Sequence, residues 1–214
     1  MQTLRFPDPR DTTDLRSFLA RAKRLDEDGV VKFRAFGDIL ACYVSPIYSG
    51  SLLADGPTIL GLRTIQLASP SELDSCYAIE EVLERLTEST SELKLPKETA
   101  RAAWTGITPP RQGWEEFGTV SQEQISKWAK DGIEEVARTL PTSVGSAIAA
   151  RVRLGIWGKT VSLEFNLPGG SAFAMAGLGF MQKDEEIKVF RTNGWVRLTS
   201  SYGHVMAKQS FKVA

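Results

Sequence analysis

The first 90 residues change from a helical to a strand-like spacing of apolar positions at Gly29. Residues 11–25 place apolar side chains three or four positions apart behind capping residues, which predicts an amphipathic helix. Residues 30–67 contain three runs rich in β-branched and aromatic residues, and turn residues separate these runs. The pattern predicts a small antiparallel sheet over 30–67, with a hairpin turn at Gly37–Asp38 between its first two strands.

A capped helix is predicted directly after this sheet. The sequence Ser-Pro-Ser-Glu at 69–72 combines a capping box with proline at the first helical position. Apolar residues recur at helical spacing from Leu73 to Leu86, and glutamates occupy the opposite face.

The pattern of the second half begins with another capping box, Ser-Gln-Glu-Gln at 121–124. An apolar stripe follows from Ile125 to Leu140, which predicts a long helix that ends at Pro141. A shorter helix is expected over 144–153, and clean alternation of apolar and polar residues predicts a strand over 160–167.

The last 45 residues contain an uncharged apolar segment and a hairpin. The segment 172–181 reads AFAMAGLGFM, and Asn193–Gly194 between two β-rich runs predicts a type I′ turn. Helix, shorter helix, strand, helix and hairpin is the element order of a winged-helix domain, and residues 139–214 hold 9 Lys/Arg against 4 Asp/Glu. However, the expected recognition helix offers no Arg, Lys, Asn or Gln before Gln182, which argues against sequence-specific DNA binding.

The fold class expected from these elements is α+β. Residues 1–90 form a helix, a small antiparallel sheet and a capped helix, and residues 121–214 form helices with a terminal β-hairpin in winged-helix-like order. Residues 91–120 form an irregular connector rich in Pro, Gly and Trp. Because neither half closes its sheet edges alone, the two halves could also share one core.

Composition places the chain among ordinary globular proteins. The 214 residues are 42% hydrophobic and 24% charged, and the formal net charge is zero. A general attraction to nucleic acid or to anionic lipid is therefore not expected. No signal-peptide-like or membrane-spanning run occurs, and neither Cys42 nor Cys76 lies in a CxxC motif, so a cytoplasmic location is expected.

Few residues are available for common catalytic mechanisms. His204 is the only histidine, so any Ser-His-Asp or Cys-His mechanism would have to use it. No P-loop, GxSxG or HExxH motif is present, and one His with two separated Cys does not make a usual zinc site. The sequence therefore predicts no catalytic residue, no metal site and no cofactor.

The candidate binding residues are large aromatic side chains and one arginine. Trp104 and Trp114 lie in irregular surroundings, and Arg111 is the obvious anion contact in the loop 105–119. Phe173 and Phe180 belong to the apolar segment 172–181, which is either core or a contact surface for protein.

Two main functional hypotheses follow. The first is a non-catalytic protein-interaction or assembly module, with a protein partner or a homo-oligomer formed through Phe173, Phe180 and exposed tryptophans. The second is a small-ligand-binding protein or an enzyme of unrecognised type, with a pocket between the halves near Arg111 and Trp114. A winged-helix-like nucleic-acid binder is the weakest alternative.

Two motifs carry a resemblance to a family. The sequences PPRQGWEEFGTVS at 109–121 and NGWVRLTSSYGHV at 193–205 resemble an uncharacterised actinobacterial protein family of about this length. The resemblance implies a cytosolic bacterial protein and assigns no activity, cofactor or site residue.

Overall fold

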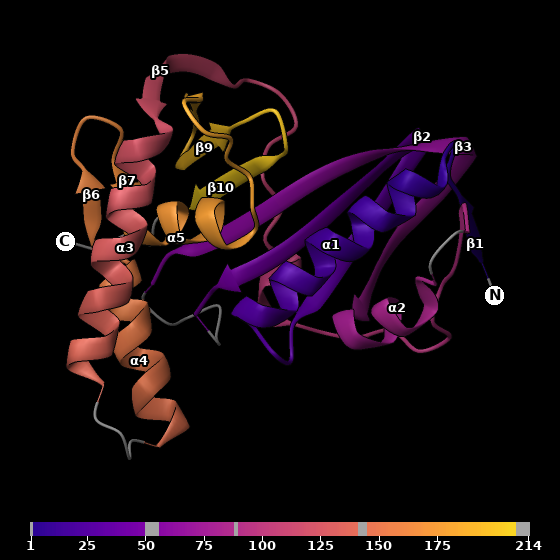
Figure 1. Ribbon diagram of the computed structural model, residues 1–214, viewed down its shortest axis with the longest axis horizontal. Coiled ribbons are helices and arrows are strands. Elements are labelled where there is room, and N and C mark those ends of the chain that lie inside the picture. The colour runs from indigo at the N-terminus through magenta and orange to yellow at the C-terminus, as the bar shows by residue number, and fades with distance from the viewer. Residues whose placement is uncertain (1, 50–55, 88–89, 141–144, 209–214) are drawn as a thin grey trace. The chain divides into compact units, whose positions relative to one another are not determined.

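The computed structural model describes residues 2–49, 56–87, 90–140 and 145–208 (Figure 1). The chain divides into two compact units. The first contains Met1–Pro46 and Leu62–Thr105, and the second contains Ile47–Gly61 and Gly106–Ala214. The largest sheet has six strands in the order β2-β3-β10-β9-β8-β5.

The first unit is built on two long strands. It contains β1 (Thr3–Arg5), α1 (Pro9–Leu25), α2 (Ile79–Arg85) and β4 (Glu92–Lys94), and most of β2 (Val30–Ile47), β3 (Thr58–Ala78) and the 3-10 helix η1 (Ala103–Gly106). Figure 1 shows α1 running along β2 and β3. The predicted first helix is confirmed, although it begins earlier than expected because Asp8 and Asp11 form its capping box.

The predicted hairpin at Gly37–Asp38 is wrong, because β2 continues through both residues. The buried side chains are Val31, Phe33 and Ala35 before the glycine and Leu40, Cys42 and Val44 after it. Burial therefore changes from odd to even positions, which is the signature of a β-bulge. Gly37 has a φ of 64°, a conformation that glycine adopts at little cost.

The predicted capped helix at 69–86 is also largely wrong. Residues 69–72 lie inside β3, which continues to Ala78, and only α2 is helical. Serine and glutamate can satisfy a helix end, but they can equally lie on an exposed strand. Pairing with a neighbouring strand overrides the local capping signal here.

The second unit combines the remaining strands with three helices. Its elements are β5 (Glu115–Ser121), α3 (Gln122–Thr139), α4 (Ser146–Trp157), β6 (Thr160–Ser162), β7 (Leu167–Pro168), α5 (Gly169–Gly177), β8 (Glu186–Thr192), β9 (Trp195–Thr199) and β10 (His204–Lys208). The predicted long helix is confirmed, because the Ser121 hydroxyl accepts a hydrogen bond from the Gln124 amide at 3.2 Å at the start of α3. The predicted hairpin is confirmed too, with Thr192 opposite Trp195 across the turn. Its predicted type I′ geometry is wrong, because Gly194 has a φ of 70° but Asn193 does not have a positive φ.

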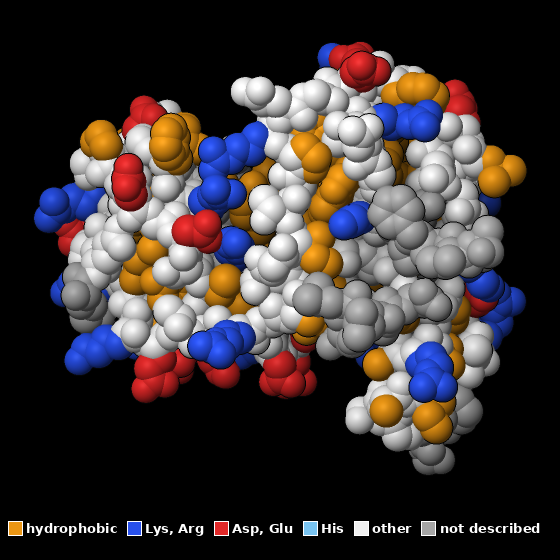
Figure 2. All heavy atoms as spheres, turned by 180° about the vertical axis from the view of Figure 1, so that it is seen from behind, with side chains coloured by type: hydrophobic (Ala, Val, Ile, Leu, Met, Phe, Trp, Pro, Cys, Tyr) orange, Lys and Arg blue, Asp and Glu red, His pale blue; other side chains and the backbone are white. Residues whose placement is uncertain are grey.

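The apolar stripe of α3 is buried only in its first half. Ile125 and Ala129 are buried, but Ile133 is 50% exposed, and Ile148 at the start of α4 is 61% exposed. Hydrophobic side chains are accordingly visible at the free end of the α3–α4 pair in Figure 2. The apolar stripe therefore predicts the helix correctly, but only the first half of the stripe is buried.

The winged-helix prediction is wrong. The helix expected to read DNA corresponds to α5, and its residues Ala172, Ala174 and Met175 are fully buried. The terminal hairpin is not a separate wing, because β8 and β9 pair with β5 and β10 in the large sheet. Half of the segment 172–181 is buried in this unit, which accounts for its lack of polar side chains.

The strand predicted over 160–167 is wrong as well. β6 and β7 are short, and a turn over 163–166 joins them. Asn166 adopts a φ of 50°, and Leu163 is 91% exposed. Apolar and polar residues do alternate over 160–167, but a tight turn divides this segment into two short strands.

Candidate functional site

A groove with a volume of about 940 Å³ lies within the second unit. The tip of the β8–β9 hairpin, the second half of α4 and the segment 158–166 form most of its walls. Its described lining holds three cationic side chains, Arg151, Lys159 and Arg191, and no carboxylate. We call it the basic groove.

Aromatic side chains hold one of these cations in place. The Arg191 guanidinium carbon lies 4.2 Å from the centroid of the Phe117 ring, a cation–π distance. Phe117 in turn contacts Phe165 edge to face, with the ring centroids 6.1 Å apart. Gly118, next to a bulge in β5, leaves room for Phe165, because a Cβ at this position would lie 3.1 Å from the Phe165 ring.

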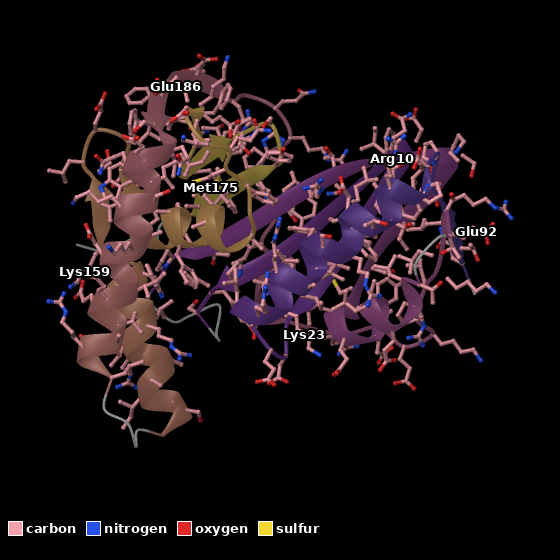
Figure 3. The ribbon with its side chains drawn as sticks, viewed as in Figure 1. Arg10, Lys23, Glu92, Lys159, Met175 and Glu186 are labelled. Carbon is pink, nitrogen blue, oxygen red and sulfur yellow. The ribbon has the colours of Figure 1, made fainter. Side chains whose placement is uncertain are left out.

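The three cations differ in how their charge is compensated. Lys159, labelled in Figure 3, follows α4 and forms an ion pair with Glu135 of α3. Arg151 and Arg191 are exposed, and neither forms an ion pair with any residue that the structure describes. The basic groove therefore keeps two uncompensated positive charges at its edge.

Apolar side chains also line the basic groove. Leu154, Phe165, Trp195 and Val196 all line the groove, and the last three are buried or nearly so. A ligand with both apolar and negatively charged groups matches this lining, because burial of apolar surface and charge pairing then act together.

The five residues singled out from the sequence do not line the basic groove. Trp104 is 2% exposed in the first unit, and Phe180 is fully buried in the second. Phe173 is partly buried and stacks on Trp157, with the ring centroids 4.4 Å apart. These three side chains belong to packed regions of the described structure.

The other two residues lie on the segment before β5. Arg111 is exposed. Trp114 is partly buried, and its Nε1 donates a hydrogen bond to the Pro110 carbonyl at 2.8 Å. Trp114 also contacts Arg197, whose guanidinium carbon lies 4.6 Å from the centroid of the indole ring.

Sequence reasoning did not find Arg151, Lys159 and Arg191. The sequence does show an excess of basic residues over 139–214, but this excess was considered only as support for DNA binding and does not indicate which basic residues lie together. Three separate elements contribute the three cations, so no local motif marks them.

The described residues contain neither a metal-binding cluster nor a membrane-spanning helix. No group of three or more His, Cys, Asp or Glu side chains in this part of the chain is placed to hold a metal ion. Among the helices of residues 2–49, 56–87, 90–140 and 145–208, none is long and apolar enough to cross a membrane.

His204, the only histidine, has an environment that disfavours its charged form. Its Nδ1 lies 3.0 Å from the Thr199 hydroxyl oxygen on the neighbouring strand. Burial lowers the pKa of His204 below its ordinary value of 6.5, and the positive charge of Arg197 lowers this pKa further.

We expect His204 to make the folded protein less stable as the pH falls from 7 toward 5. Below pH 6.5 the unfolded chain binds a proton at His204 more readily than the folded chain does, so the free energy of unfolding decreases, by at most about 1.4 kcal/mol per pH unit. Urea unfolding at several pH values measures this slope. His204→Asn should flatten it between pH 7 and 5, and an unchanged slope in this variant would contradict the assignment.

Comparisons with known proteins divide the chain in the same region as the two units. Residues 1–106 match the family described as Domain of unknown function (DUF8010), and residues 109–212 match Domain of unknown function (DUF8185). The sequence has no match among the curated proteins. The match to families without an assigned function agrees with the resemblance noted in the sequence, and the actinobacterial source stays a prediction.

Solved structures resemble the whole chain. A protein assigned as a DNA polymerase III beta subunit from Eubacterium rectale superposes with a TM-score of 0.53 at 8% identity, over 99% of this chain and 67% of that one. The fold of this chain resembles that of a DNA polymerase III beta subunit. The beta subunit from DNA polymerase of Streptococcus pyogenes gives a TM-score of 0.50 at 11% identity, over 99% and 65% of the two chains. The chain thus spans about two thirds of the length of these structures, and their sheet-rich α+β fold differs from a winged helix.

Proposed function

We propose that the protein is a non-catalytic interaction module that binds an acidic segment of a partner protein in the basic groove. The observation that carries this proposal is the lining of the groove, where Arg151, Lys159 and Arg191 surround apolar side chains and no carboxylate is present among the described lining residues. The beta-subunit fold supports a binding role, since the similar structures are named as subunits of a polymerase assembly.

A peptide segment suits the groove better than nucleic acid does. Nucleic-acid surfaces follow the phosphate backbone with a track of basic residues, and their affinity depends chiefly on these contacts. The basic groove has three cations around a larger set of apolar groups, and one of the three already pairs with Glu135. A peptide with acidic side chains beside an aromatic or leucine side chain would contact both the cations and the apolar groups of the groove.

The first test uses a fluorescein-labelled heptapeptide made of Asp, Glu, Leu and Phe, and fluorescence anisotropy measures its Kd. A matched peptide with Asn and Gln in place of the acids keeps its size and apolar groups. We expect the acidic peptide to bind, the amide peptide to bind at least tenfold more weakly, and the affinity to fall with added salt. Equal binding of the two peptides would contradict the proposal.

Variants then locate the site. Arg151→Gln removes a cation for which no ion pair is described, and combining it with Arg191→Gln should weaken the acidic peptide about tenfold. Arg153→Gln is the matched control, because Arg153 is exposed on the same helix but does not line the groove. Unchanged affinity in the double variant would place the peptide elsewhere. Competition by inorganic phosphate at low concentration would instead favour a small anionic ligand.

A further inference from the structure

Arg197 lies between two aromatic rings on the surface of β9. Its guanidinium carbon is 4.6 Å from the Trp114 ring centroid and 4.3 Å from the Phe190 ring centroid. Phe190 is directly opposite Arg197 in the β8–β9 pairing, so their side chains share one face of the sheet. Trp114 reaches the same guanidinium from the segment before β5, and its hydrogen bond to Pro110 fixes the indole.

Arg197 and the groove residue Arg191 project from opposite faces of the sheet. Arg191 and Val196, which line the groove, form the neighbouring pair in the same ladder. Because successive side chains of a strand point to opposite faces, Arg191 and Arg197 belong to different surfaces.

The charge of Arg197 has no compensating anion among the described residues. No ion pair joins it to a carboxylate in this part of the chain, and its buried Nε atom has no hydrogen-bond acceptor there. The carboxylate opposite Phe190, that of Glu116, already pairs with Lys188 at 3.1 Å. Burial lowers the pKa of Arg197, which reflects the cost of desolvating this cation.

We infer that Arg197, Trp114 and Phe190 form a second binding site, and that its ligand is a carboxylate. The two rings contact the guanidinium at cation–π distances, so its N–H groups are what remains for a ligand. Two parallel N–H groups match the two oxygens of a carboxylate. The surrounding apolar side chains, including the buried Met206 opposite Arg197 on β10, strengthen such a pair by excluding water.

The site goes beyond the proposed function and does not depend on it. A phosphate group offers similar oxygens, so the shared chemistry is that of an oxyanion, and the test separates the two. A cation that only braces the Trp114 segment to the sheet would give the same contacts without binding any anion, and the test separates this role as well.

The experiment is an NMR titration of the full chain at pH 7 and constant ionic strength. Sodium acetate is the probe, acetamide is the neutral control, and inorganic phosphate is the competing oxyanion. We expect the Arg197 Nε and Trp114 Nε1 resonances to shift and saturate at millimolar acetate, with no shift by acetamide and a weaker response to phosphate. Shifts that never saturate with acetate, or saturation by phosphate alone, would overturn the inference.

Two variants complete the test. Arg197→Lys keeps the positive charge but lacks the planar fork, and should abolish the saturable shift of Trp114. Arg191→Lys, on the opposite face of the sheet, should leave the shift unchanged. A saturable shift that survives in Arg197→Lys would also overturn the inference. The wild-type titration decides the question even if Arg197→Lys folds poorly, and it is independent of peptide binding in the basic groove.

Discussion

Replacing Phe180 with alanine is expected to lower the free energy of unfolding by about 3–5 kcal/mol. The Phe180 side chain is fully buried in the second unit, so its removal leaves a cavity and forfeits the burial of an aromatic ring. Urea unfolding followed by tryptophan fluorescence measures the change. Because the side chain is not exposed, light scattering should find the assembly state of the folded variant unchanged.

Leu163→Ala is the matched control for Phe180. Leu163 belongs to the same unit and is 91% exposed, so its truncation should change the free energy of unfolding by less than about 0.5 kcal/mol. A Phe180→Ala variant that is as stable as the wild type but assembles differently would revive the hypothesis that this segment is a contact surface.

The second large effect is expected for Gly132→Ala, which should destabilise the protein although replacing a helical glycine with alanine usually stabilises it. Gly132 lies within α3, where alanine normally stabilises by about 1 kcal/mol. A Cβ at Gly132, however, would lie 2.2 Å from the Cζ3 atom of Trp157. Trp157 is 5% exposed and stacks on Phe173, so it has little room to move. We expect Gly132→Ala to destabilise the protein by about 1–3 kcal/mol, measured by urea unfolding.

Gly155→Ala provides the control in the neighbouring helix α4. A Cβ at Gly155 meets nothing within 4 Å, so alanine there should stabilise by roughly 0.5–1 kcal/mol. If both alanine variants were stabilised equally, the close approach of Trp157 to α3 would be wrong. In the Trp157→Leu background, Gly132→Ala should cost less than it does in the wild type, because the smaller side chain removes the clash.

Features with local causes could be predicted from the sequence. The start of α3 follows from the Ser121 capping residue, and the β8–β9 turn follows from Asn193–Gly194. In both cases the interacting residues lie within a few positions of one another, so the local sequence is enough to predict the structure.

Features decided by strand pairing could not be predicted in this way. Gly37–Asp38 suits a turn and a bulge equally, and residues 69–72 suit a helix end and an exposed strand. The neighbouring strands decide between these alternatives, and they come from distant parts of the chain.

The candidate sites show the same limit more strongly. The sequence marks Trp114 as a large aromatic side chain in an irregular segment, but nothing in it marks the cationic neighbour Arg197, which lies 83 positions away. Arg151 and Arg191 come from different elements of the second unit and share no motif. A single sequence gives the residue types, and the fold decides which of them meet.

The bulge in β2 also bears on how the length of this strand can vary. Because Gly37 is one residue in excess of a regular ladder, its deletion would leave Val31, Phe33 and Ala35 on the same face as Leu40, Cys42 and Val44. Deleting another residue from either half would instead turn the side chains beyond it toward the wrong face. What the extra glycine contributes is therefore local curvature and twist, and the amphipathic pattern of the strand does not depend on it.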